Sequence, residues 1–235
     1  MNPLHNSTNA PAHAMVAVPG TAPATGRSAE SLRVLRNTWA LLAMTLLFSA
    51  GVATVVTAWK LPAPGLLLTL GGYFGLLFAI HKLQNSGWAV GLVFALTGFM
   101  GWTLGPMLQA TLALPGGAQS IALALGATGL TFLGLSSWVL TTRRDFSFLG
   151  GFLFAGMLVA LLAGLAAMFF QMPALSLAVS AAVALLSAGL ILFETSRIVN
   201  GGETNYVLAT VSLFVSIFNL FTSLLSLFGF GSNEE

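Results

Sequence analysis

The sequence predicts an all-α membrane protein built as a bundle of seven transmembrane helices. Hydrophobic residues make up 57% of the 235 residues and charged residues only 6%, with a mean hydropathy of +0.92. A soluble domain carries about a quarter charged residues, so this composition excludes a soluble domain. Seven apolar runs approach the ~20 residues that a helix needs to cross a bilayer.

The chain divides into two parts. Residues 1–30 are rich in Pro, Ala, Ser, Thr and Asn and have no apolar period, which predicts a disordered cytosolic tail. The first apolar run starts far from Met1 and is longer than the core of a secretory signal, so we expect no signal peptide. Residues 31–235 are expected to form one seven-helix transmembrane domain.

The spans follow one another with short connections. They are Thr38–Trp59, Pro64–Ile80, Trp88–Ala110, Gln119–Thr141, Phe148–Phe170, Ala174–Phe193 and Tyr206–Phe230. Most prolines fall in the breaks, because proline cannot donate to a helix ladder. Pro106 lies inside the third span, where it predicts a kink.

The basic residues predict the orientation. With the N-terminus inside, the inner segments hold seven of the eight and the outer segments hold only Lys60. The inner ones are Arg27, Arg33, Arg36, Lys82, Arg143, Arg144 and Arg197. Since inner loops of membrane proteins are enriched in Lys and Arg, we expect the N-terminus in the cytosol and the C-terminus outside.

Small residues recur at four-residue spacing in several spans. The sets are Gly71 and Gly75, Gly87 and Gly91, Gly101 and Gly105, and Gly156, Ala160 and Gly164. Such spacing lets two helices approach closely. We expect packing within one chain, and a dedicated dimer face is the alternative.

The last span carries a seam of small polar residues, defined as Ser212, Ser216, Asn219, Ser223 and Ser226. Steps of three and four place all five along one side of a helix. Lipid cannot satisfy such a stripe, so the seam is expected to face protein or trapped water.

Glu194, at the end of the sixth apolar run, is the main candidate for a functional group. The turn to the last span is short, so antiparallel packing would bring Glu194 near Ser212 and Ser216. Glu194 would then serve as a pH-sensing group of a polar interior, together with Arg197. In the other interpretation, Glu194 and Arg197 form an exposed i,i+3 pair at the cytosolic rim, which contributes little.

A cytosolic loop containing Arg143, Arg144 and Asp145 is the second candidate, although topology alone accounts for its two arginines. Catalytic patterns are absent: the chain has no cysteine, zinc-protease motif, phosphate loop or hydrolase elbow. We therefore expect no enzymatic activity, no cofactor and no metal site.

Three segments carry a resemblance to a known family. The stretch ILFETSRIVNGGETNYVLATVSLFVSIFNLFTSLLSLFGF resembles the C-terminal signature of the Bax inhibitor-1 (transmembrane Bax-inhibitor-motif) family. TTRRDFSFLGGFLFAG resembles the loop motif of that family, and SLRVLRNTWALLAMTLLFSAGVAT its first span. The likeness extends from about Ser31 to Phe230 and is strongest to the bacterial YccA branch.

The resemblance implies a seven-helix bundle with the last helix central, in the bacterial inner membrane. It implies one of two activities. Members of that branch bind and restrain the membrane-anchored ATP-dependent zinc protease FtsH, whereas others are pH-sensitive calcium leak channels governed by two acids. Glu194 matches the first acid, but Ser216 stands where the channels have the second. Binding to the protease is therefore the preferred hypothesis, and a calcium leak is the alternative.

Overall fold

The computed structural model describes residues 24–231, which form seven α-helices and one 3₁₀ turn. The helices are α1 (Ala24–Ala58), α2 (Leu66–Leu83), α3 (Ala89–Leu112), α4 (Gly117–Thr142), α5 (Gly150–Phe169), α6 (Pro173–Val199) and α7 (Tyr206–Gly231), and the turn is η1 (Ser147–Leu149). All seven helices are long and apolar enough to span a membrane. The predicted seven-helix class is confirmed.

Two helices extend well beyond their predicted spans. Most of the predicted tail, residues 1–23, lies outside the described residues, and α1 begins at Ala24. Helix α6 continues past Phe193 to Val199, so Glu194 and Arg197 lie within its last turns. Pro106 does not end α3, which runs on to Leu112; the kink expected there stays a prediction.

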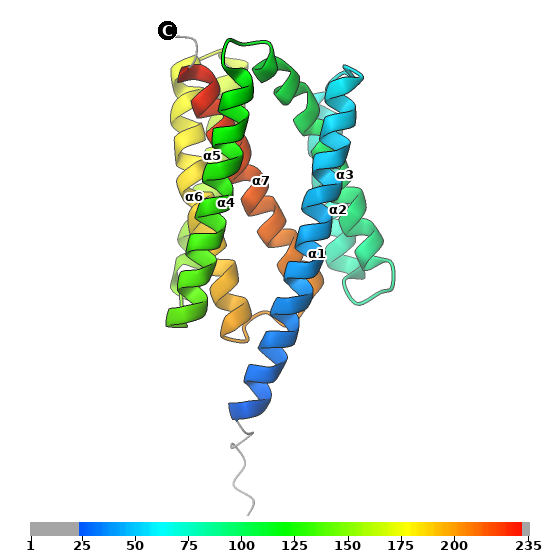
Figure 1. Cartoon of the computed structure of the whole chain (residues 1–235), viewed down its shortest axis with the longest axis vertical. Helices are drawn as coiled ribbons and strands as arrows, with labels where there is room; N and C mark the ends of the chain where they lie inside the picture. Colours follow the sequence, from blue (N-terminus) through cyan, green and yellow to red (C-terminus); the bar gives the residue numbers. More distant parts are fainter. Residues whose placement is uncertain (1–23, 232–235) are drawn as a thin grey trace, which may run out of the picture.

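Helix α7 occupies the centre of the bundle. Half of its span is buried inside the protein, against 6% of the span of α2. Helices α6, α4, α1 and α3 all pack against it, and Figure 1 shows it running obliquely between the α1–α3 side and the α4–α6 side. Leu213, Phe214 and Leu225 are almost completely buried. The central last helix confirms the expectation drawn from the family resemblance.

Glycine brings α1 and α3 together. A Cβ atom added to Gly101 would lie 2.5 Å from the carbonyl oxygen of Ser49, and one added to Gly105 would lie 2.2 Å from Cγ1 of Val56. These glycines therefore pack within the chain, as expected. Gly71 and Gly75 differ, because a Cβ atom at either would meet nothing within 4 Å.

The connections that follow α2, α4 and α6 lie at one end of the bundle. Asn205, after α6, donates a hydrogen bond to Gln84, which follows α2. Asn200, at the end of α6, donates to the carbonyl oxygen of Arg144, which follows α4. A pocket joins the start of α1, at Glu30, to the same α6–α7 connection. We call this the polar end of the bundle.

Candidate functional site

The polar end is organised by the way α6 stops. Gly202 N–H donates to the carbonyl oxygen of Arg197 at 2.8 Å, and Gly201 N–H donates to that of Ile198 at 3.3 Å. This pair of bonds is a Schellman motif, which needs a residue with positive φ after the helix. Gly201 supplies it with φ of 75°. The chain is thereby turned sharply from α6 towards the start of α7.

Glu194 lies one turn before this stop and is buried, with 7% of its surface exposed. Its Oε2 atom lies 3.6 Å from Nη1 of Arg197. The same oxygen accepts no hydrogen bond within the described residues. Glu194 therefore forms an i,i+3 pair with Arg197, at an enclosed rather than an exposed position.

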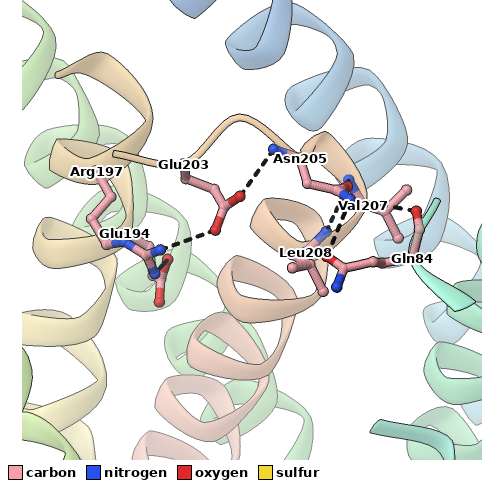
Figure 2. Close-up of polar contacts among 7 residues, drawn as sticks. All are labelled: Gln84, Glu194, Arg197, Glu203, Asn205, Val207 and Leu208. Carbon is pink, nitrogen blue, oxygen red and sulfur yellow. Dashed lines mark hydrogen bonds and ion pairs between the residues drawn. The ribbon is translucent and has the colours of Figure 1, made fainter. Parts of the chain in front are cut away.

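Arg197 joins two carboxylates from different segments. Its Nη2 atom donates to Oε2 of Glu203 at 3.1 Å, while Nη1 faces Glu194. The guanidinium also lies over the ring of Phe193, 5.5 Å from the ring centre. One cation on α6 therefore forms ion pairs with an acid on its own helix and with a second acid in the α6–α7 connection, as Figure 2 shows.

Asn205 extends this chain of contacts to α7 and to the α2–α3 connection. Its N–H donates to Oε1 of Glu203 at 2.9 Å. Its Oδ1 accepts from the N–H groups of Val207 and Leu208 at 2.9 and 3.4 Å, which caps the N-terminus of α7.

The side-chain amide nitrogen of Asn205 donates hydrogen bonds to the α2–α3 connection. It bonds to the carbonyl oxygen and Oε1 of Gln84 at 3.4 and 3.3 Å, and to Oδ1 of Asn85 at 3.3 Å. Contacts thus run from α6 to the α2–α3 connection, and Figure 2 draws them as far as Gln84. We name Glu194, Arg197, Glu203, Asn205 and Gln84 the polar network.

The seam of α7 is enclosed but does not meet Glu194 through a hydrogen bond. Ser216 and Ser223 are buried, and Ser212, Asn219 and Ser226 are partly buried. The Ser216 hydroxyl donates to the carbonyl oxygen of Ser212 on its own helix at 2.9 Å. No hydrogen bond links Glu194 to these five residues, so their apposition and the pH-sensing role stay predictions.

The α4–α5 loop, the second candidate site from the sequence, lies beside the polar network. Arg143, Arg144 and Asp145 are all exposed. Hydrogen bonds from the hydroxyl and the N–H of Ser147 lower the pKa of the Asp145 carboxyl below its ordinary value. Asp145 therefore stabilises a local turn, and neither arginine of this loop forms an ion pair in the described part of the chain.

Ser196 holds this loop against α6 through hydrogen bonds. Its Oγ accepts from the N–H of Phe146 at 2.9 Å and donates to the carbonyl oxygen of Arg144 at 3.1 Å. Ser196 is fully buried. The loop backbone is thus held next to the turn of α6 that carries Glu194 and Arg197.

Sequence reasoning missed Glu203, Asn205, Gln84 and Ser196. Asn205 had a usable signal, because asparagine directly before an apolar helical run is a typical N-cap. The others had none, since their partners are 50 or more residues away or depend on the geometry of the α6 stop. Among the described residues no three His, Asp or Glu side chains gather as metal ligands.

Comparison with known proteins places the chain among membrane proteins. The family model described as "Inhibitor of apoptosis-promoting Bax1" matches residues 32–233. The chain is 54% identical over 202 residues to "Modulator of FtsH protease YccA" from Escherichia coli (strain K12), covering 86% of this chain and 92% of that protein. "Inner membrane protein YccA" from Escherichia coli O6:H1 is also 54% identical, with the same coverage.

A more distant relative shows the same extent of match. An "Uncharacterized membrane protein" from Vibrio cholerae is 45% identical over 210 residues, which is 89% of this chain and 94% of that protein. The family model covers the seven membrane-spanning helices except for the first residues of α1. The chain therefore belongs to the Bax inhibitor-1 family, the family of "Inhibitor of apoptosis-promoting Bax1".

Proposed function

We propose that this chain is a multi-pass protein of the bacterial inner membrane that binds the FtsH protease and restrains it. The observation that carries the proposal is 54% identity to a protein named as a modulator of that protease, over 92% of the length of the relative. The seven apolar helices fit the membrane location.

The polar end supports a binding role over a catalytic one. Arg197 forms ion pairs with Glu194 and Glu203, and Asn205 caps the N-terminus of α7. Asn205 joins the α6–α7 connection to the α2–α3 connection, and Ser196 joins the α4–α5 loop to α6. The arrangement presents a rigid surface, which suits recognition by another protein.

The orientation proposed from the basic residues places the polar end in the cytosol. Arg33, Arg36, Lys82 and the two arginines of the α4–α5 loop belong to segments that start or end there. Lys60 follows the other end of α1. With this orientation the N-terminal segment lies in the cytosol, the compartment that supplies ATP to an ATP-driven protease.

Restraint follows from the contrast between the N-terminal segment and the bundle. The composition of residues 1–30 suits the grip of an unfolding motor. Force on that segment is transmitted to α1, which packs against α3, α6 and α7. Because Gly101 and Gly105 bring α3 against the backbone of α1, extraction would separate closely packed helices. The protease is occupied while this chain stays folded.

The proposal is tested by reconstitution with the purified protease in liposomes. The chain should co-purify with the protease and slow its degradation of a membrane substrate, while itself remaining intact. A variant lacking residues 2–23 keeps the described bundle and should restrain less. A matched control carries a Gly/Ser segment of equal length at the same place, and should restrain as the wild type does. Unchanged substrate turnover with the wild-type chain would contradict the proposal.

The alternative function is a pH-sensitive calcium leak. The observation that favours it is Glu194, whose buried Oε2 accepts no hydrogen bond within the described residues. A single carboxylate with neighbouring hydroxyls is a thin site for an ion that takes six to eight oxygens. Calcium entry into liposomes that contain the chain alone, lost in Glu194→Gln, would favour this alternative over protease binding.

A further inference from the structure

Helix α2 has an outward face that the rest of the bundle leaves uncovered. Only 6% of its span is buried, and it packs chiefly against α3. Its inner side carries Ile80, which is almost fully buried, and Gly72, which approaches the ring of Phe99. The outer side carries Phe74 and Phe78, which are 50% and 71% exposed.

A groove of about 720 Å³ runs along this outer face. Phe74, Leu77 and Phe78 line it, and His81 and Lys82 stand at its end. Leu77 and Phe78 follow Phe74 by three and four residues, and His81 and Lys82 follow Phe78 by three and four, so all five lie towards one side of the helix. A Cβ atom added to the neighbouring Gly75 would meet nothing within 4 Å.

The groove is apolar along most of its length and basic at one end. Its walls are apolar, while the last turn of α2 supplies the Lys82 ammonium and the His81 imidazole. Both residues are exposed, and neither forms an ion pair within the described part of the chain. A ligand complementary to this groove has a hydrocarbon part and an anionic end.

Helix ends with basic side chains lie at the depth of lipid headgroups. Lys82 is at the polar end of the bundle, where the α2–α3 connection joins the polar network through Gln84. A second copy of the chain fits the groove poorly, because copies inserted in the same orientation and packed through α2 would bring Lys82 against Lys82. We propose that this groove binds an anionic phospholipid, with its acyl chain along Phe74 and Phe78 and its phosphate at Lys82 and His81.

Because the chain has no cysteine, one introduced thiol reports on this groove alone. Phe78→Cys, labelled with a fluorophore, is reconstituted with brominated phosphatidylglycerol or brominated phosphatidylcholine as quencher. We expect stronger quenching by phosphatidylglycerol. Adding Lys82→Gln should lower that preference about fivefold, because one basic residue near the surface contributes about 1 kcal/mol to binding of an anionic lipid, whereas Lys82→Arg should keep it.

Two controls separate this site from a general attraction to the membrane. Phe154→Cys on α5 is a matched position, since Phe154 is 72% exposed, and its quenching should not change with Lys82→Gln. Lys60→Gln, at the other end of the bundle, should leave the preference at position 78 intact. Equal quenching by the two lipids at position 78, or a preference unchanged by Lys82→Gln, would overturn the proposal. Disulfide-linked dimers of Phe78→Cys in liposomes would also overturn it, because a second copy would then fill the groove.

Discussion

At the scale of residues, the polar end depends on two side chains that each serve several partners. Arg197 forms ion pairs with two carboxylates, one of which is buried. Asn205 caps α7 with its oxygen and holds the α2–α3 connection with its nitrogen. Removing either therefore disturbs more than one segment, and the separate roles can be resolved by conservative variants.

Asn205→Ala should destabilise the protein by about 1 kcal/mol, the usual effect of losing an N-cap. Asn205→Asp keeps the cap but loses the amide donor to Gln84 and Asn85. We expect it to be closer to wild type in thermal unfolding followed in detergent. Equal losses in the two variants would show that the contacts to the α2–α3 connection, rather than the cap, stabilise this end.

Arg197→Met should destabilise the protein by ~1–2 kcal/mol, because Glu194 then keeps a buried carboxylate without its cation. The value is below that for a fully buried pair, since the Arg197 side chain is 32% exposed. Adding Glu194→Gln should recover part of the loss, as measured by a double-mutant cycle of unfolding free energies. Arg36→Met, an exposed cation of α1, is the control and should have little effect. Additive effects of the two changes at 194 and 197 would show that the pair has no energetic coupling.

At the scale of elements, glycines with the same spacing have opposite surroundings. Gly101 and Gly105 face α1 across a close contact, whereas Gly71 and Gly75 face outward from α2. The sequence shows the spacing in both pairs but does not show which side of each helix is covered. That depends on how the seven helices assemble, so the packing role could be predicted for the set but not for each pair.

Gly101→Ala should lower the unfolding free energy by about 1–3 kcal/mol, the usual effect of overpacking. The added Cβ would lie 2.5 Å from a backbone oxygen of Ser49, which cannot rotate away. Gly75→Ala is the matched control, because its Cβ meets nothing within 4 Å, and alanine favours a helix by up to ~1 kcal/mol. A midpoint of unfolding that falls equally in both variants would contradict this account of α1–α3 packing.

The end of α6 illustrates another limit of the sequence. The apolar run stops at Phe193, but the helix continues to Val199, because its end is set by the backbone turn at Gly201. Glu194 therefore occupies a helical, enclosed position. Hydropathy locates the membrane spans well, yet helix ends depend on hydrogen bonds such as the one from Gly202 to Arg197.

At the scale of the whole molecule, composition and periodicity were sufficient for the number of helices. The central place of α7 was also accessible, because a row of polar side chains disfavours lipid. The polar network was not, since it joins residues that are distant in sequence, such as Gln84 and Asn205. Local patterns indicate which residues avoid lipid, and only the assembled bundle determines their partners.

The orientation proposed for the bundle is testable because the chain has no cysteine. Ala63 and Thr142 are exposed, at the connection after α1 and at the last residue of α4. In intact spheroplasts a membrane-impermeant maleimide should label Ala63→Cys and should label Thr142→Cys only after permeabilisation. The reverse pattern would place the polar end outside the cell.

The position of α7 also bears on how the protein is made. Synthesis releases α1, α3, α4 and α6 from the ribosome before α7, the helix that these four contact. Until translation passes Gly231, the surfaces of α1, α3, α4 and α6 that finally contact α7 lack their partner. The bundle is therefore completed only when the last helix has been translated. A nascent chain that stalls before that point leaves the centre of the bundle exposed to the quality-control machinery of the membrane.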